Sequence, residues 1–256
     1  MHLALISLGA AFGGAAGLFI PRPAYRLAVR AGETWRTHCP QGHAITGMAA
    51  GWVGLPCCAG NRQPMAGVGA WNRSCRYGRG RVVAPAVAAL VCALLPAVVG
   101  MRPELLLWML LTPIAVLLGL VDAAAHRLPD MLTLPAAGLT VALLGAAALL
   151  PGHQGSWIAS VEASLVLGVI YFAMFLINPS GMGFGDVKLA LTVGALLGWY
   201  GWPILFLGTL VTFACGALFA IGLLITRRAT RRSAMAFGPF MLIGALAGVL
   251  FGAWTA

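Results

Sequence analysis

Residues 204–226 read ILFLGTLVTFACGALFAIGLLIT, a stretch of chain without a single charged side chain. A lipid bilayer requires about 20 consecutive apolar residues from a helix that spans it. A helix of this length at the surface of a soluble protein would carry a polar face toward water. Residues 204–226 therefore predict a transmembrane helix.

Segments of the same kind recur along the whole chain. Of its 256 residues, 61% are hydrophobic and 9% are charged, whereas soluble domains are about 45–50% apolar and about 25% charged. This composition excludes soluble enzymes, secreted disulfide scaffolds and disordered tails. Apolar segments of spanning length lie at 3–20, 82–100, 104–121, 132–150, 157–177, 187–202, 204–226 and 237–255. The predicted fold is an all-α, polytopic integral membrane protein with about eight transmembrane helices.

Basic residues are distributed unevenly over the loops, and this predicts the orientation. With the N-terminus outside, the inner loops hold 15 of the 16 Lys and Arg residues, and both termini lie outside. Arg102 is the exception, and we expect it at the outer interface together with Glu104. The net charge of +10 then reflects membrane topology, so no nucleic-acid partner is expected. The four inner loops are 21–81, 122–131, 178–188 and 227–236.

One loop is long enough to form a soluble part. The predicted organisation is a first transmembrane helix at 1–20, a basic cytosolic loop at 21–81 and a helical bundle at 82–256. The loop contains nine Arg and one acid, and we expect its Arg-rich face to contact anionic lipid headgroups. Its four Cys are weak metal candidates, since their spacing matches no common zinc site, and no metal is expected. These are Cys39, Cys57, Cys58 and Cys75.

Two acids on the inner side can share one site. Asp122 ends an apolar run, and Asp186 opens another, 16 residues before Trp202. That separation corresponds to about 24 Å of helix, so Asp186 lies near the inner edge if Trp202 marks the outer interface. A charge at this depth is costly unless it faces water or a partner. Asp122 and Asp186 therefore lie at similar depths on different helices, where they can form a dyad.

Three glycines come just before Asp186. Gly181, Gly183 and Gly185 leave the backbone without side chains, so another backbone can approach closely. A peptide substrate laid across this stretch could hydrogen-bond to main-chain groups. An ordinary flexible loop between two helices has the same composition and stays open as the alternative.

Paired carboxylates are the machinery of an aspartyl protease. Like charges a few ångströms apart cannot both ionise easily, so one proton is shared between them. The ionised carboxylate takes a proton from water, which attacks the scissile carbonyl, and the protonated one polarises the carbonyl oxygen. The sequence contains no His-Glu-x-x-His zinc motif and no phosphate-binding glycine loop.

These motifs resemble those of a known family, the type IV prepilin peptidases, which are membrane aspartyl peptidases with a Gly-x-Gly-Asp motif. The matching segments are DAAAHRLPDMLT at 122–133, GMGFGDVKL at 181–189 and FGPF at 237–240. The resemblance implies an eight-span endopeptidase of the inner (cytoplasmic) membrane with a cytosolic active site and with Asp122 and Asp186 as catalytic residues. It also implies prepilin or pseudopilin substrates of type IV pili or protein secretion, cut after their short basic leader.

Two further residues of these motifs receive expected roles. Asp130 corresponds to a family position that is often Asn, and we expect it to cap the N-terminus of the helix that follows. Lys188 is the only Lys in the chain and matches a Lys that the family favours. It either positions the dyad or its loop, or it extends toward the lipid headgroups.

The resemblance is weakest in the loop 21–81. Many bacterial members carry two Cys-x-x-Cys pairs there and also N-methylate the cleaved pilin with S-adenosylmethionine. Here Gly42 and Gly78 stand at the second position of each pair. Proteolysis requires no cofactor, and methylation with S-adenosylmethionine stays open. A catalytically inactive assembly factor and an ion-relay transporter stay open as alternative functions.

Overall fold

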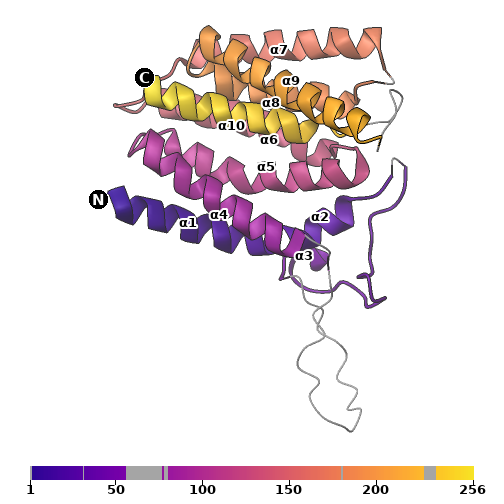
Figure 1. Cartoon of the computed structure of the whole chain (residues 1–256). Coiled ribbons are helices and arrows are strands. Elements are labelled where there is room, and N and C mark those ends of the chain that lie inside the picture. The colour runs from indigo at the N-terminus through magenta and orange to yellow at the C-terminus, as the bar shows by residue number, and fades with distance from the viewer. Residues whose placement is uncertain (1, 31, 56–76, 78–79, 180, 228–234) are drawn as a thin grey trace.

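The chain is described here by a computed structural model, which covers residues 2–30, 32–55, 77, 80–179, 181–227 and 235–256. Its long helices run side by side and alternate in direction (Figure 1). Seven helices in the described residues are long and apolar enough to cross a membrane. The predicted polytopic all-α fold is confirmed. The helices are α1 (His2–Phe19), α2 (Pro21–Leu27), α3 (Met48–Gly51), α4 (Gly80–Val99), α5 (Leu105–Ala125), α6 (Asp130–Ala148), α7 (Trp157–Ile177), α8 (Phe184–Gly198), α9 (Trp202–Ile225) and α10 (Gly238–Thr255).

Helix α8 is the shortest of the helices in the bundle and lies at its centre. We expected a span at 187–202, whereas α8 begins at Phe184 and ends at Gly198 after 15 residues. Its length is about 22 Å, which is less than the about 30 Å of a hydrocarbon core. Ten of its residues are buried, and it packs against α6, α7, α9 and α10. Protein rather than lipid therefore surrounds most of α8.

The two ends of the bundle differ in what they carry. Both chain termini lie at one end, and α2 and α3 lie at the other (Figure 1). Helices α6, α8 and α10 begin at the end that holds α2 and α3, and α5 ends there. The last turn of α5 contains Asp122, and the first turn of α8 contains Asp186. Both aspartates therefore lie at the same end as α2 and α3, the described helices within the basic segment 21–81.

Two Arg residues in the described part of 21–81 form hydrogen bonds within that segment. Arg22 donates to the carbonyl oxygen of Thr46 over 3.0 Å, and Arg26 donates to that of Ala50 over 2.9 Å. Both Arg side chains are buried. Burial, followed by the neighbouring Arg22, lowers the pKa of the Arg26 guanidinium. The expectation of an Arg-rich lipid-facing surface is therefore wrong for Arg22 and Arg26, because backbone carbonyls occupy their donors.

Candidate active site

Asp122 lies in the last turn of α5 and is only 4% exposed. The helix ends at His126, which has a left-handed backbone (φ 50°) and donates its N–H to the carbonyl oxygen of Asp122 over 2.8 Å. The Asp122 side chain faces α10, where its Oδ2 accepts the backbone N–H of Gly238 over 2.9 Å. A peptide hydrogen bond therefore fixes the orientation of this carboxylate.

Gly238 is the first residue of α10. The first N–H groups of a helix have no partner within the helix, and they carry a partial positive charge. A Cβ added at Gly238 would lie 2.8 Å from Asp122 Oδ2 and 3.2 Å from its Cγ. The carboxylate therefore occupies the space that any larger side chain would need. Sequence reasoning missed this contact, although the FGPF segment at 237–240 was its signal.

Asp186 is the third residue of α8 and is 6% exposed. Its Oδ2 accepts the backbone N–H of Gly183, the residue that caps the helix, over 3.1 Å. An acid at this position also stabilises the positive end of the helix dipole. Asp122 and Asp186 lie close enough to interact electrostatically. The structure thus brings together the two acids that the sequence singled out.

The three glycines before Asp186 have different surroundings. A Cβ added at Gly185 would lie 2.8 Å from the Cβ of Leu128, in the segment between α5 and α6. Gly185 therefore lets the segment around Leu128 pack closely against the start of α8, as expected of a residue without a side chain, and its role in substrate binding stays a prediction. Gly181 and Gly183 are exposed, but their N–H groups are donated to the carbonyl oxygen of Asn178 and to Asp186, over 3.1 Å each.

Lys188 forms an ion pair across the site. Its Nζ lies 2.6 Å from Asp130 Oδ1 and 4.7 Å from the centre of the Phe184 ring. The expected helix cap at Asp130 is wrong, because Pro129 takes that position and Asp130 is the first helical residue of α6. The Asp130 carboxylate binds Lys188 instead. This pair joins the starts of α6 and α8.

The sequence that contains these residues is similar to those of known proteins. The sequence model of the type IV leader peptidase family matches residues 109–221. A prepilin leader peptidase/N-methyltransferase of Escherichia coli (strain K12) is 30% identical over 168 residues, which cover 65% of this chain and 71% of that protein. The chain belongs to the type IV leader peptidase family. The family match includes both aspartates and Lys188, and it ends before Gly238.

Two further relatives are considerably longer than the part of their own sequence that this chain matches. A prepilin leader peptidase/N-methyltransferase of Aeromonas salmonicida (strain A449) is 38% identical over 171 residues, which are 64% of this chain and 56% of that protein. One of Pseudomonas putida is 34% identical over 173 residues, or 63% of this chain and 56% of that protein. The chain therefore spans little more than half the length of these two relatives. No solved structure matches.

An aromatic cluster forms the apolar wall of the site in this leader peptidase family member. Tyr171 of α7 is buried and interacts electrostatically with Asp186. Its ring centre lies 6.3 Å from that of Phe237 and 6.1 Å from that of Phe213. Sequence reasoning missed Tyr171, since a single Tyr within an apolar span carries no signal of its own.

Cys39 is the described member of the four Cys considered as metal candidates. It is buried, and its Sγ lies 3.5 Å from His43 Nδ1. Cys57, Cys58 and Cys75 lie outside the described residues. Within the described ranges, no group of three His, Cys, Asp or Glu side chains is arranged to hold a metal ion. The absence of a metal in 21–81 stays a prediction.

Proposed function

We propose that the chain is a membrane aspartyl endopeptidase that removes the leader from prepilin-like substrates at the cytosolic face. The observation that carries the proposal is the pair Asp122 and Asp186, two buried carboxylates that interact at one end of the bundle. Membership of the type IV leader peptidase family supports the substrate class, since the relatives are named prepilin leader peptidases.

The hydrogen bonds of the dyad suit this chemistry. Asp122 and Asp186 each use Oδ2 to accept one backbone N–H, from Gly238 and Gly183 respectively. In the described part of the chain this leaves Oδ1 of each carboxylate for water and substrate. We propose that these two interacting carboxylates share one proton, so that one is protonated while the other is ionised.

Hydrolysis then follows from the shared proton. The ionised carboxylate takes a proton from water as the water oxygen forms a bond to the scissile carbonyl carbon. The protonated carboxylate donates a hydrogen bond to the carbonyl oxygen and stabilises the tetrahedral intermediate. When the C–N bond breaks, a carboxylic acid of the dyad gives its proton to the leaving amine. The reaction consumes one water and regenerates one shared proton.

The cytosolic orientation is part of this proposal. The dyad lies at the end of the bundle that holds α2 and α3 of the basic segment 21–81, and basic loops favour the cytosolic side. Arg30 and Arg36 in this segment are exposed; Arg36 donates one N–H to the carbonyl of Tyr25 over 3.3 Å, and we propose that Arg30 contacts anionic headgroups. We propose the inner membrane as the location, with substrates that reach the dyad from the membrane.

Methylation is not included in the proposed function. The names of the relatives include N-methyltransferase, which would require S-adenosylmethionine. Glu33, the one acid of 21–81, accepts the N–H of Arg30, while Arg22 and Arg26 bind backbone carbonyls. Glu33 is thus the one carboxylate among the described residues of 21–81, and we assign it no role toward the cofactor, so methylation stays open. No step is derived through this cofactor.

Co-expression with a type IV prepilin, followed by mass measurement of the pilin, tests the proposal. The chain is expected to reduce the pilin mass by that of the leader, and Asp122→Asn or Asp186→Asn is expected to abolish the reduction. Asp130→Asn is the matched control, because Asp130 lies at the same end of the bundle but binds Lys188 instead of the dyad. Full cleavage by Asp186→Asn would contradict the proposed peptidase function. A pilin that stays unprocessed when co-expressed with the unaltered chain would also contradict it. An unprocessed pilin is also what an inactive assembly factor or an ion-relay transporter would give.

A further inference from the structure

An apolar groove of about 390 Å³ runs along the face of the bundle between α4 and α10. Helix α5 forms its floor, and α4 and α10 form its walls (Figure 1 shows α5 between these two helices). Thr112 has the one hydroxyl side chain of the lining, and it donates to the carbonyl of Trp108 in its own helix over 2.8 Å. The groove therefore offers almost no polar partner to an occupant.

One end of this groove reaches the candidate active site. Its lining includes Ala123, which follows Asp122, and Pro239, which follows Gly238. The Gly238 N–H is the group that holds the Asp122 carboxylate. At the other end the lining reaches Trp108, 15 residues before Ala123 along α5. The groove therefore extends about 22 Å along α5 from the dyad.

The floor of the groove permits a helix to approach closely. Ala115, Gly119 and Ala123 are spaced by four residues on α5 and all line the groove. Residues four apart lie on one face of a helix, and small residues at this spacing let two transmembrane helices come close together. An acyl chain needs no such spacing.

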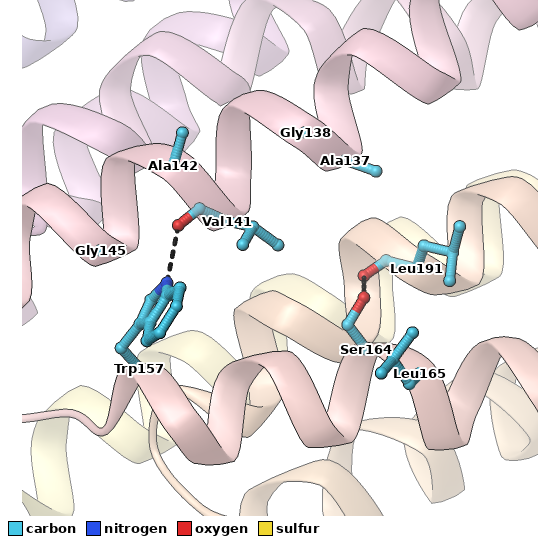
Figure 2. A pocket seen from close by; sticks show the side chains of 9 residues that line it. All are labelled: Ala137, Gly138, Val141, Ala142, Gly145, Trp157, Ser164, Leu165 and Leu191. Carbon is cyan, nitrogen blue, oxygen red and sulfur yellow. Dashed lines mark hydrogen bonds between the residues drawn. The ribbon is translucent and has the colours of Figure 1, made fainter.

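A second cavity of about 470 Å³ lies between α6 and α7 and provides a comparison. Figure 2 shows its lining, in which Trp157 Nε1 donates to the carbonyl of Val141 over 3.0 Å. On α6 this lining begins at Ala137, seven residues after Asp130, or about 10 Å beyond the start of the helix. The second cavity therefore stays away from the dyad end, unlike the groove.

We infer that the groove between α4 and α10 seats an apolar transmembrane helix of the substrate and presents the peptide just beyond that helix to Asp122 and Asp186. A chain segment within lipid must satisfy its backbone internally, so a helix is the form in which a protein occupant can lie there. A groove of this length accepts about 15 residues of helix. The inference rests on the proposed function, because it assigns the occupant as substrate.

Variants that fill the groove test this inference. Gly119→Leu fills the floor, where an added Cβ meets only the flexible end of Leu242, and Val87→Trp narrows the α4 wall at a side chain that is 40% exposed. Gly138→Leu is the matched control, because it adds the same side chain to the second cavity at a position with no atom within 4 Å.

The measured quantity is KM for a full-length prepilin in membranes and for a soluble peptide that carries the leader and cleavage site alone. Gly119→Leu and Val87→Trp are expected to raise KM for the full-length prepilin at least tenfold and to leave the soluble peptide unchanged. Gly138→Leu is expected to change neither value. Equal KM values for the groove variants and the unaltered chain would overturn the inference while leaving the peptidase intact, provided that Asp186→Asn is inactive.

Photocrosslinking identifies the occupant directly. A benzoylphenylalanine at position 87, in the Asp186→Asn background, is expected to crosslink to co-expressed prepilin. Crosslinks to phospholipid alone, or to a second copy of this chain alone, would overturn the inference. Cleavage by Asp186→Asn itself would instead refute the proposed function.

Discussion

Gly238→Ala is the sharpest test of the site geometry, because it adds one methyl group against the dyad. The added Cβ would lie 2.8 Å from Asp122 Oδ2, and real Cβ atoms essentially never come within 3.0 Å of another heavy atom. Either the carboxylate or the start of α10 must therefore move. Both movements weaken the bond of 2.9 Å from the Gly238 N–H to Asp122.

The expected loss follows from that hydrogen bond. A bond to a charged group contributes about 1.5–3 kcal/mol, and about 1.4 kcal/mol corresponds to a tenfold change in rate. Gly238→Ala should therefore lower kcat/KM about 10- to 100-fold. Ala is a better helix former than Gly, so the substitution does not weaken α10 itself, but loss of the hydrogen bond should lower the melting temperature by about 3–12 °C.

Cleavage of a type IV prepilin in membranes, with thermal unfolding measured in parallel, decides the outcome. Gly222→Ala is the matched control, because Gly222 lies in the part of α9 near the same end and an added Cβ meets no atom within 4 Å. The control is expected to keep full activity. Full activity of Gly238→Ala would refute the role of the Asp122–Gly238 bond.

Two further predictions concern the same end of the bundle. Lys188→Met should lower kcat/KM about fivefold, since an ion pair with one exposed partner contributes about 1 kcal/mol, whereas Asp130→Asn keeps an oxygen for Lys188 and should retain most activity. Greater loss in Asp130→Asn than in Lys188→Met would contradict this positioning role. Alkaline phosphatase fused after Gly155 should be active outside, and green fluorescent protein fused after Arg232 should fluoresce in the cytosol, because the loop at 151–156 contains no basic residue and that at 227–236 contains four. Swapped signals would place the dyad on the outer side.

The sequence could predict the dyad because depth in a membrane is readable from the chain. Apolar segments have the length of the bilayer, so an acid at the end of one is placed along the membrane normal. Asp122 and Asp186 were placed at one level in this way, and the structure has them interacting. The lateral arrangement of helices is not encoded so directly. An apolar helix face can pack against lipid or against protein, so the sequence did not reveal that α8 is short and central, or that Tyr171 interacts electrostatically with Asp186.

Glu104 shows the same limit at the other end of the bundle. Its position beside Arg102 at the start of α5 suggested an acid at the outer interface, yet its side chain is 0% exposed. Tyr200, which follows α8, interacts electrostatically with it and stacks on Trp108 at 6.1 Å between ring centres. The depth of Glu104 was readable from the chain, but the helices that cover it were not.

The two aspartates are held by the same kind of hydrogen bond. The two bonds differ in how far apart donor and acceptor lie in the sequence. Each accepts an N–H from the start of a helix, and each of these N–H groups belongs to a glycine. Gly183 lies three residues before Asp186, so their contact is local in the chain, although the sequence analysis expected Gly183 to contact substrate rather than Asp186. Gly238 lies 116 residues after Asp122, so the corresponding contact exists only once α10 has packed beside α5. Half of the site therefore rests on hydrogen bonding within a short segment, and the other half depends on tertiary packing that no spacing within the chain could express.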